Sequence, residues 1–158
     1  MKSTNSWKLK FGGHTKEELL ILLSKNKTCL NAYATMLFMD EKFLTSSTEK
    51  EARLVELNLS DMGFKSGAKY SEVVEASKVM GLQMCPLEIA PYFRIHFKNQ
   101  NEGPFLTLAS FKMRDCEEYP NGFSLKRYDN NLWLRGYCST SDWVWGNESK
   151  FVFAERLA

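Results

Sequence analysis

The sequence predicts an α+β fold in which N-terminal helices pack on a C-terminal antiparallel sheet of about four to six strands. Capping residues followed by apolar residues at helical spacing occur in the first half of the chain. Alternation of apolar and polar residues, the pattern of strands, dominates the second half. Of the 21 aromatic residues, 14 lie from Tyr92 onward, and aromatic residues are enriched in strands.

Two helices are predicted near the N-terminus. Thr15 and Glu18 have the spacing of a capping box, and an apolar run follows over 19–23, so we expect a helix to about residue 25. A second helix over 28–39 would place most of its apolar residues on one face.

The middle of the chain mixes loops with regular structure. Residues 45–51 are rich in serine, threonine and charge, which is typical of a loop. The alternation over 55–59 suggests a strand, while the residues just before it favour a helix equally. A further helix is expected from Ser71, its cap, to Gly81, which has the position of a left-handed C-cap.

The sheet is predicted to begin after Pro91. Phe93, Ile95 and Phe97 alternate with polar residues, as in a strand with one solvent-exposed face. Residues 129–131 (Asp-Asn-Asn) separate two later strands and tolerate the positive φ of a hairpin turn. The predicted strands cover residues 93–97, 105–113, 123–128, 132–138, 143–145 and 151–154.

The length of 158 residues fits a single domain, 1–158. Within it, residues 1–50 are expected to form a helical segment that could be semi-independent, and residues 51–158 a helix plus the antiparallel sheet. The net charge is only +2, from 21 basic and 19 acidic residues. Nucleic-acid-binding domains usually carry a basic excess, so a nucleic-acid partner is disfavoured.

The chain is expected to be a cytoplasmic protein without a membrane segment. Its N-terminus shows no signal peptide, and no run approaches the roughly 18 apolar residues of a membrane span. The four cysteines are widely spaced and are expected to be reduced, and no metal or cofactor is predicted. The glycines lack the spacing of nucleotide-binding loops.

Cys85 is the strongest candidate nucleophile. The run Cys85-Pro86-Leu87-Glu88 has proline and glutamate where a helix start prefers them, which places Cys85 near a helix N-terminus. Such a position lowers a thiol pKa, and His96 is the nearest candidate base. A buried, inert thiol is the competing interpretation. No complete catalytic set is recognised, so the sequence favours a protein that is not an enzyme.

Aromatic residues interleaved with arginine form the only candidate recognition surface. Such combinations can stack on bases, sugars or the side chains of a partner. The alternation should send Trp133 to the face opposite Leu132 and Leu134. The alternative is that the tryptophans fill the space between sheet and helices. The candidate binding residues are Trp133, Arg135, Trp143, Trp145 and Arg94, with Tyr137 and Arg127 nearby in sequence.

The chain resembles a family of small bacterial proteins for which no activity is established. These proteins share a Leu-Cys-Pro-x-Glu-Val-Ala/Gly-Pro block followed by a Leu-Trp-Leu strand and a Phe-Val-Phe strand. The resemblance covers roughly residues 55–156 and implies a bacterial origin, but the loop 114–122 departs from the family's Asp-Ser-Asp-Gly-like turn. The matching residues are Gly63-Phe64, Gly67-Ala68, Gly81, Leu82, Cys85, Pro86, Glu88, Ile89, Ala90, Pro91, Arg94, Leu132-Trp133-Leu134, Trp145 and Phe151-Val152-Phe153.

The leading hypothesis is a non-enzymatic binding or regulatory module whose partner is another protein. In this hypothesis the module binds its partner through the surface of the sheet that carries the aromatic and arginine residues. The alternatives are a small thiol-dependent enzyme that uses Cys85 with His96 and Glu88, and a single-strand nucleic-acid binder that stacks bases on the tryptophans. The sequence does not indicate an oligomeric state.

Overall fold

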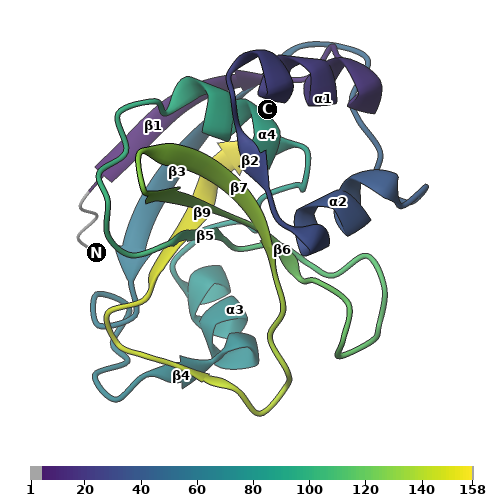
Figure 1. Ribbon diagram of the computed structural model, residues 1–158. Helices are drawn as coiled ribbons and strands as arrows, with labels where there is room; N and C mark the ends of the chain where they lie inside the picture. Colours follow the sequence, from purple (N-terminus) through teal and green to yellow (C-terminus); the bar gives the residue numbers. More distant parts are fainter. Residues whose placement is uncertain (1–4, 158) are drawn as a thin grey trace.

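Seven strands form one curled sheet in the order β1-β3-β9-β5-β6-β7-β2, as the computed structural model shows for residues 5–157 (Figure 1). For residues 156 and 157 only the backbone is described. The first four residues, part of the segment in which no signal peptide is predicted, lie outside this range. The strands are β1 (Asn5–Phe11), β2 (Cys29–Leu30), β3 (Lys50–Asn58), β5 (Leu106–Leu108), β6 (Gly122–Tyr128), β7 (Asn131–Tyr137) and β9 (Lys150–Leu157), and β4 (Ala68–Lys69) pairs with β8 (Val144–Trp145) in a second, small sheet.

The α+β class is confirmed, but the main sheet is larger than the predicted four to six strands and is mixed. β5 runs parallel to β9, and β2 runs parallel to β7, while the other neighbours are antiparallel. The added strands come from the N-terminal part of the chain. Trp7, Leu9 and Phe11 alternate along β1, and β1 pairs over its whole length with β3, so residues 1–50 contribute strands as well as helices.

Helices cover both faces of the sheet, whereas the prediction placed them on one face. The helices are α1 (Lys16–Lys25), α2 (Ala32–Met39), α3 (Tyr70–Val79) and α4 (Ile89–His96). Buried residues of α1, α2 and α4 join one hydrophobic cluster, and Val73 of α3 joins another cluster on the opposite face. Among the described residues, no helix is both long enough and apolar enough to cross a membrane.

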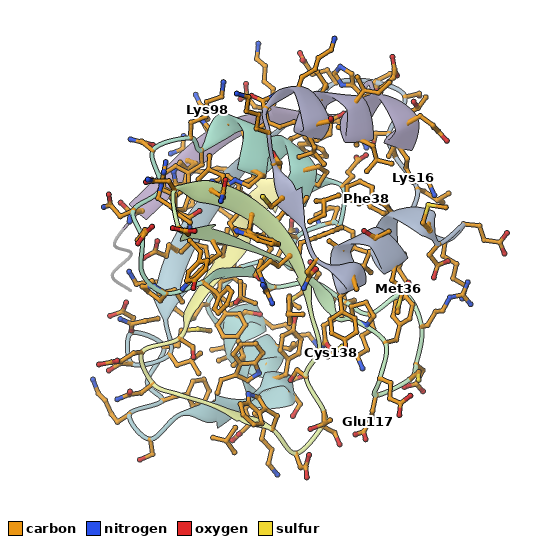
Figure 2. The ribbon with its side chains drawn as sticks, viewed as in Figure 1. Lys16, Met36, Phe38, Lys98, Glu117 and Cys138 are labelled. Atoms are coloured by element: carbon orange, nitrogen blue, oxygen red, sulfur yellow. The ribbon has the colours of Figure 1, made fainter. Side chains whose placement is uncertain are left out.

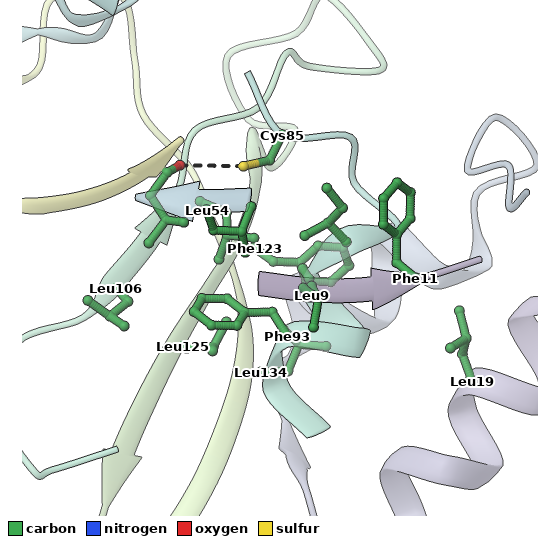
Figure 3. Packing of buried hydrophobic residues seen from close by; sticks show 14 of the residues in the cluster. Leu9, Phe11, Leu19, Leu54, Cys85, Phe93, Leu106, Phe123, Leu125 and Leu134 are labelled. Carbon is green, nitrogen blue, oxygen red and sulfur yellow. Dashed lines mark hydrogen bonds between the residues drawn. The ribbon is translucent and has the colours of Figure 1, made fainter. Parts of the chain in front are cut away.

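The larger hydrophobic cluster connects the three helices to nearly every strand of the sheet. Phe93 of α4 and Phe123 of β6 are fully buried at its centre, and Leu9 of β1 packs among them (Figure 3). Burial of each such side chain contributes about 1.5–3 kcal/mol relative to leaving it exposed. The smaller cluster joins β3, β9 and α3, through residues such as Val55, Phe151 and Val73.

Residues 89–96 form a helix, so the prediction of a strand over 93–97 is wrong. The buried residues Ile89, Ala90, Phe93 and Arg94 have the spacing of a helix face, and Phe93 stacks on Phe97 one turn later. Pro91 is tolerated because it lies in the first turn, where a backbone N–H has no partner within the helix. The predicted strand pattern used every second residue and missed this longer period.

The predicted helix start at Cys85 is also wrong. Residues 82–88 are irregular: Gln83 forms an isolated bridge with Ala154, and the backbone N–H of Cys85 donates to the Ala109 carbonyl. α4 starts after Glu88. The carboxylate of Glu88 accepts hydrogen bonds from the backbone and hydroxyl of Ser46, so it holds the loop before β3 in place of capping a helix.

Several local predictions are confirmed. Thr15 and Glu18 form the predicted capping box of α1. β6 and β7 form the predicted hairpin, with Asp129 and Asn130 at positive φ in its turn. The strand over 55–59 is confirmed as the end of β3, while the strand predicted over 105–113 is limited to Leu106–Leu108.

The remaining helix boundaries shift by a few residues. The helix predicted over 28–39 starts only at Ala32, because Cys29–Leu30 join the sheet as β2 and Asn31 caps the helix with its side chain. α3 begins at Tyr70 instead of at Ser71, and the Glu72 carboxylate accepts the backbone N–H of Lys69.

Candidate functional site

A pocket of about 360 Å³ opens on the face of the main sheet that α3 covers only in part. α3 packs on the half formed by β3 and β9, through Val73 against the cluster of Val55 and Phe151. Beside it, residues of β5, β6 and β7 line a hollow together with Trp143 and Trp145. We call the hollow there the Arg135 pocket, and it is lined by Tyr33, Phe105, Thr107, Ser124, Arg135, Gly136, Tyr137, Cys138, Trp143 and Trp145.

A polar row crosses the sheet in this pocket. Thr107 of β5 is paired in register with Ser124 of β6, which in turn is paired with Arg135 of β7. Thr107 and Ser124 are only 4% and 3% exposed. Among the described residues neither hydroxyl has a hydrogen-bond partner. Both residues line the pocket, and neither oxygen is fully enclosed by the protein, so the two hydroxyls keep hydrogen-bonding capacity for a bound group.

The guanidinium of Arg135 is held by aromatic rings instead of by an acid. Its central carbon lies 5.6 Å from the centroid of Phe105 and 5.8 Å from that of Trp133. Within residues 5–157 it forms no hydrogen bond or ion pair with the protein. An arginine stacked on rings with free N–H donors has the geometry for recognising an anion.

Lys126 is the second cation on this face, but it is already engaged. Its ammonium lies 4.6 Å from the Phe105 centroid and donates to the Gly103 carbonyl. Arg135 is therefore the cation available to a ligand in the pocket.

Aromatic side chains form the walls of the pocket. Trp145 packs edge-on against Tyr137, with ring centroids 5.9 Å apart, and its indole N–H donates to the Ser139 hydroxyl at 3.2 Å. Trp143 is 57% exposed. Trp145 is therefore held in place by its neighbours, while Trp143 offers a free apolar surface at the edge of the pocket.

Gly136 allows α2 to approach the pocket. A Cβ atom at Gly136 would lie 2.6 Å from the carbonyl carbon of Tyr33, a distance that real Cβ atoms do not adopt. The amide of Asn31 donates to the Gly136 carbonyl and accepts from its N–H. The Asn31 amide thus bonds to the edge of β7 as a neighbouring strand would. The close approach of α2 also brings Tyr33 to the wall of the pocket.

A buried tyrosine pair supports the pocket from below. The hydroxyls of Tyr70 and Tyr137 lie 3.0 Å apart, and Tyr137 donates to the Leu108 carbonyl. Burial raises the pKa of Tyr70 to about 12 and holds that of Tyr137 well above its usual value. Both hydroxyls therefore stay protonated at neutral pH and act as fixed hydrogen-bonding groups.

The structure brings together most of the predicted binding residues. Arg135, Trp143 and Trp145 line the same pocket, and Trp133 lies beside it, against Arg135. Trp133 is half-buried, and its indole N–H is buried without a hydrogen-bond partner.

Arg94 does not belong to this surface, so the prediction that it is one of the binding residues is corrected. It lies on α4 and is 1% exposed. Its guanidinium donates to the Gln100 side chain at 2.6 Å and to the carbonyls of Phe97 and Trp133. Desolvation lowers the Arg94 pKa to about 10. Arg127 is likewise engaged, with the carbonyls of Lys98 and Gln100.

Six pocket residues were missed at the sequence level, among them Gly136. Tyr33 and Phe105 belong to segments distant from the tryptophans, and Cys138 lies beside Tyr33, whose hydroxyl pKa it raises through a hydrogen bond. The alternation along β6 and β5 could have placed Ser124 and Thr107 on the face of Arg135. Figure 2 labels Cys138 and, in the neighbouring loop, Glu117.

Cys85 does not have the environment of a catalytic thiol. It is buried in the larger hydrophobic cluster, and its thiol donates to the Val152 carbonyl at 3.5 Å (Figure 3). Burial raises the pKa of this thiol to about 12. A thiol that is protonated at neutral pH is a poor nucleophile. His96 is exposed in the last turn of α4.

A larger hollow of about 530 Å³ lies between the end of α3 and the segment 82–87, with the exposed Phe111 at its edge. Its lining is mainly apolar. The Ser77 hydroxyl donates to the Val74 carbonyl, and the Cys85 thiol is bonded as described above. Lys78 pairs with Glu75, so the described lining of this hollow lacks the free hydroxyls and the unpaired cation that distinguish the Arg135 pocket.

No family model, curated protein or solved structure matches this chain. In the described range, no three histidine, cysteine, aspartate or glutamate side chains are grouped so that they could hold a metal ion. All four cysteines are free. The geometry of the Arg135 pocket is therefore the main ground for assigning a function.

Proposed function

We propose that this chain is a non-enzymatic binding module that holds a partner protein at the Arg135 pocket. One observation carries the proposal: an unpaired guanidinium lies over the rings of Phe105 and Trp133, in register with the hydroxyls of Ser124 and Thr107, which line the pocket and have no partner among the described residues. A cation and two hydroxyls without partners of their own are suited to receive polar groups from another molecule.

The edge of the pocket has the composition of a protein-binding surface. Trp143, Phe105 and Tyr33 are exposed large hydrophobic residues at this edge, and Arg135 lies among them. Tryptophan, tyrosine and arginine are the residues most enriched at the energetic centres of protein interfaces. Trp143 and Tyr33 would lose exposed apolar surface when a partner covers the pocket.

The surroundings support binding over catalysis. In the described part of the chain, no histidine or carboxylate is hydrogen-bonded to the hydroxyl of Ser124 or Thr107. A serine or threonine without a neighbouring base is not activated as a nucleophile. The thiol of Cys138 points to the Glu118 carbonyl at 3.5 Å, which likewise supplies no base.

Acidic residues beside the pocket argue against a nucleic-acid ligand. Glu117 binds the backbone and hydroxyl of Ser141, and Asp142 binds the hydroxyl of Thr140, in the loop that carries Trp143. Nucleic-acid sites gain most of their affinity from clustered cations around the phosphates. Carboxylates at the edge of the pocket would oppose that attraction.

We also propose that the chain is a cytoplasmic member of the small bacterial proteins with the Leu-Cys-Pro-x-Glu block. The block residues support a shared structural role: Cys85 packs in the core, Glu88 holds the loop at Ser46, and Arg94 binds carbonyls at the end of α4.

The function is tested by capture of partners from bacterial lysate on the purified chain, followed by an affinity measurement with the isolated partner. Replacing Trp143 by alanine should weaken binding at least about 10-fold, as loss of a central aromatic residue does at protein interfaces. The matched control is Phe111→Ala, an exposed aromatic residue at the other hollow. Equal affinity of wild type and Trp143→Ala would refute binding at this pocket.

A further inference from the structure

We infer that the Arg135 pocket binds an aromatic carboxylate, with the acid group on Arg135 and the ring among the tryptophan and tyrosine side chains. This inference rests on the proposed function, since it concerns the same pocket, and it names the chemical group that the pocket binds. Two sources share this chemistry: a free aromatic acid, and the C-terminal phenylalanine, tyrosine or tryptophan of a peptide chain.

Hydrogen-bond donors without partners in the pocket indicate that the ligand carries a negative charge. The Arg135 guanidinium forms no hydrogen bond or ion pair within the described chain, and the hydroxyls of Ser124 and Thr107 are also unpaired. Ser124 is in register with both Thr107 and Arg135, so the three groups lie side by side across the strands. Guanidinium binds a carboxylate through two parallel N–H···O bonds, and a neighbouring hydroxyl can donate a third.

A carboxylate fits this site better than a phosphate. Among the described residues Arg135 is the one unpaired cation in the pocket lining, and the nearby Lys126 ammonium is taken up by the Gly103 carbonyl and the Phe105 ring. A second negative charge would find no further unpaired cation among the described residues that line the pocket. The site therefore balances a single negative charge.

The aromatic walls and the volume of the Arg135 pocket indicate that the ligand carries an aromatic ring. Trp145 and Tyr137 present ring surfaces that are locked by their mutual edge-on contact and by the Ser139 hydroxyl. Aromatic rings pack favourably on such walls in edge-to-face or offset arrangements. The volume of about 360 Å³ lies at the low end of the range for small-molecule sites, about 300–1,000 Å³. It fits one ring-bearing group better than a long chain.

The test is a titration of the full chain, followed by tryptophan fluorescence and by calorimetry. One pair of probes is naphthalene-2-carboxylate and naphthalene-2-carboxamide. The other is a hexapeptide ending in phenylalanine, with a free carboxyl or as the amide. We expect an acid to bind at least about 10-fold more tightly than its matched amide, because the amide cannot form charge-assisted bonds to the guanidinium.

Variants connect the binding to Arg135. Arg135→Gln should abolish the preference for the acid over the amide. Arg135→Lys should restore only part of it, because an ammonium cannot form the two parallel bonds. The control is Arg53→Gln, since Arg53 lies on β3 and pairs with Glu155 away from the pocket. Circular dichroism establishes that each variant is folded.

Each outcome decides the inference. Tighter binding of the naphthoate assigns a free acid as ligand, and tighter binding of the free-carboxyl peptide assigns a chain terminus. Equal binding of acids and amides, an unchanged preference in Arg135→Gln, or no binding of any probe would overturn the inference. The proposed function would then still be decided separately, by the effect of Trp143→Ala on the captured partner.

Discussion

Arg94 and Arg135 contact the same tryptophan, yet they have opposite surroundings. Arg94 reaches the Trp133 carbonyl from α4, in the larger hydrophobic cluster. Arg135 lies over the Trp133 ring on the other face of the sheet. Both terminal nitrogens of Arg94 donate to Gln100 or to backbone carbonyls, and its Nε is buried without a partner among the described residues. The donors of Arg135 meet no acceptor in the described chain.

This difference separates an arginine that builds the fold from one that is free to bind. A guanidinium carries five N–H donors, and burying them without acceptors is costly. The end of α4 and the loop at Gln100 supply acceptors for both terminal nitrogens of the buried Arg94, which offsets most of this cost although its Nε has no acceptor in the described chain. Arg135 keeps its donors accessible at a pocket, where a ligand can satisfy them. Residue type alone would have assigned both arginines to the same surface.

The largest expected effect in this comparison is on stability. Arg94→Met should lower the free energy of unfolding by about 2–4 kcal/mol, because it leaves the Gln100 side chain and two carbonyls without donors in the protein interior. Arg135→Met should change it by less than about 1 kcal/mol, because it loses only the contacts of the guanidinium with the rings of Phe105 and Trp133. Urea denaturation followed by circular dichroism measures both values.

Equal losses in the two variants would contradict this division of roles. A loss only in Arg135→Met would reverse it and would make the pocket arginine the structural one.

The next effect concerns the wall of the Arg135 pocket. Gly136→Ala should destabilise the protein by about 1–3 kcal/mol, the usual cost of overpacking, because the new methyl group collides with the backbone of Tyr33. Thermal unfolding measures the loss. Gly146→Ala is the matched control, since a Cβ at Gly146 meets no atom within 4 Å. If the Gly136→Ala protein were as stable as this control, α2 would be able to move away from β7 at little cost.

A third arginine provides the smallest effect and sharpens the comparison. Arg114 has a carboxylate partner, donating to both oxygens of Asp40, which also accepts from Tyr119. Arg114 and Tyr119 hold the pKa of Asp40 well below its usual value. Because the folded-state pKa is depressed, the contribution of Asp40 to stability is present above the unfolded pKa of about 3.9 and is lost as the pH falls further.

Asp40→Asn should therefore be less stable than wild type at pH 7, and the difference should shrink below about pH 4 as the carboxylate is protonated. Urea midpoints measured from pH 7 to pH 2 test this. A difference that stays constant over that range would show that the charge of Asp40 is not what stabilises the loop 109–121.

The features predicted correctly are those set by neighbours in the sequence. The capping box of α1 needs only Thr15 and Glu18, three residues apart. The β6–β7 turn needs only two residues that tolerate positive φ, Asp129 and Asn130. Both signals are local, so no distant contact was required to recognise them.

The errors have physical causes as well. In residues 93–97 a period of two and a helical period are both compatible with the apolar residues, and packing of Phe93 in the core selects the helix. β1 was missed although Trp7, Leu9 and Phe11 alternate, because a single strand gains stability only from its pairing with β3, whose residues lie 39 to 51 positions further along the chain. The candidate site was predicted in part: Arg135, Trp143 and Trp145 meet there, while Arg94 was misplaced.

Short-range patterns were sufficient to establish the α+β class, the first helix, the hairpin and the aromatic surplus of the second half. Long-range packing alone decided that β1, β2 and β3 join the sheet and that helices cover both of its faces. It also decided that Tyr33, Thr107, Ser124 and Arg135 share one pocket. The physical reason is that each of these outcomes depends on hydrogen bonds and side-chain contacts between residues far apart in the chain, which local propensities do not encode.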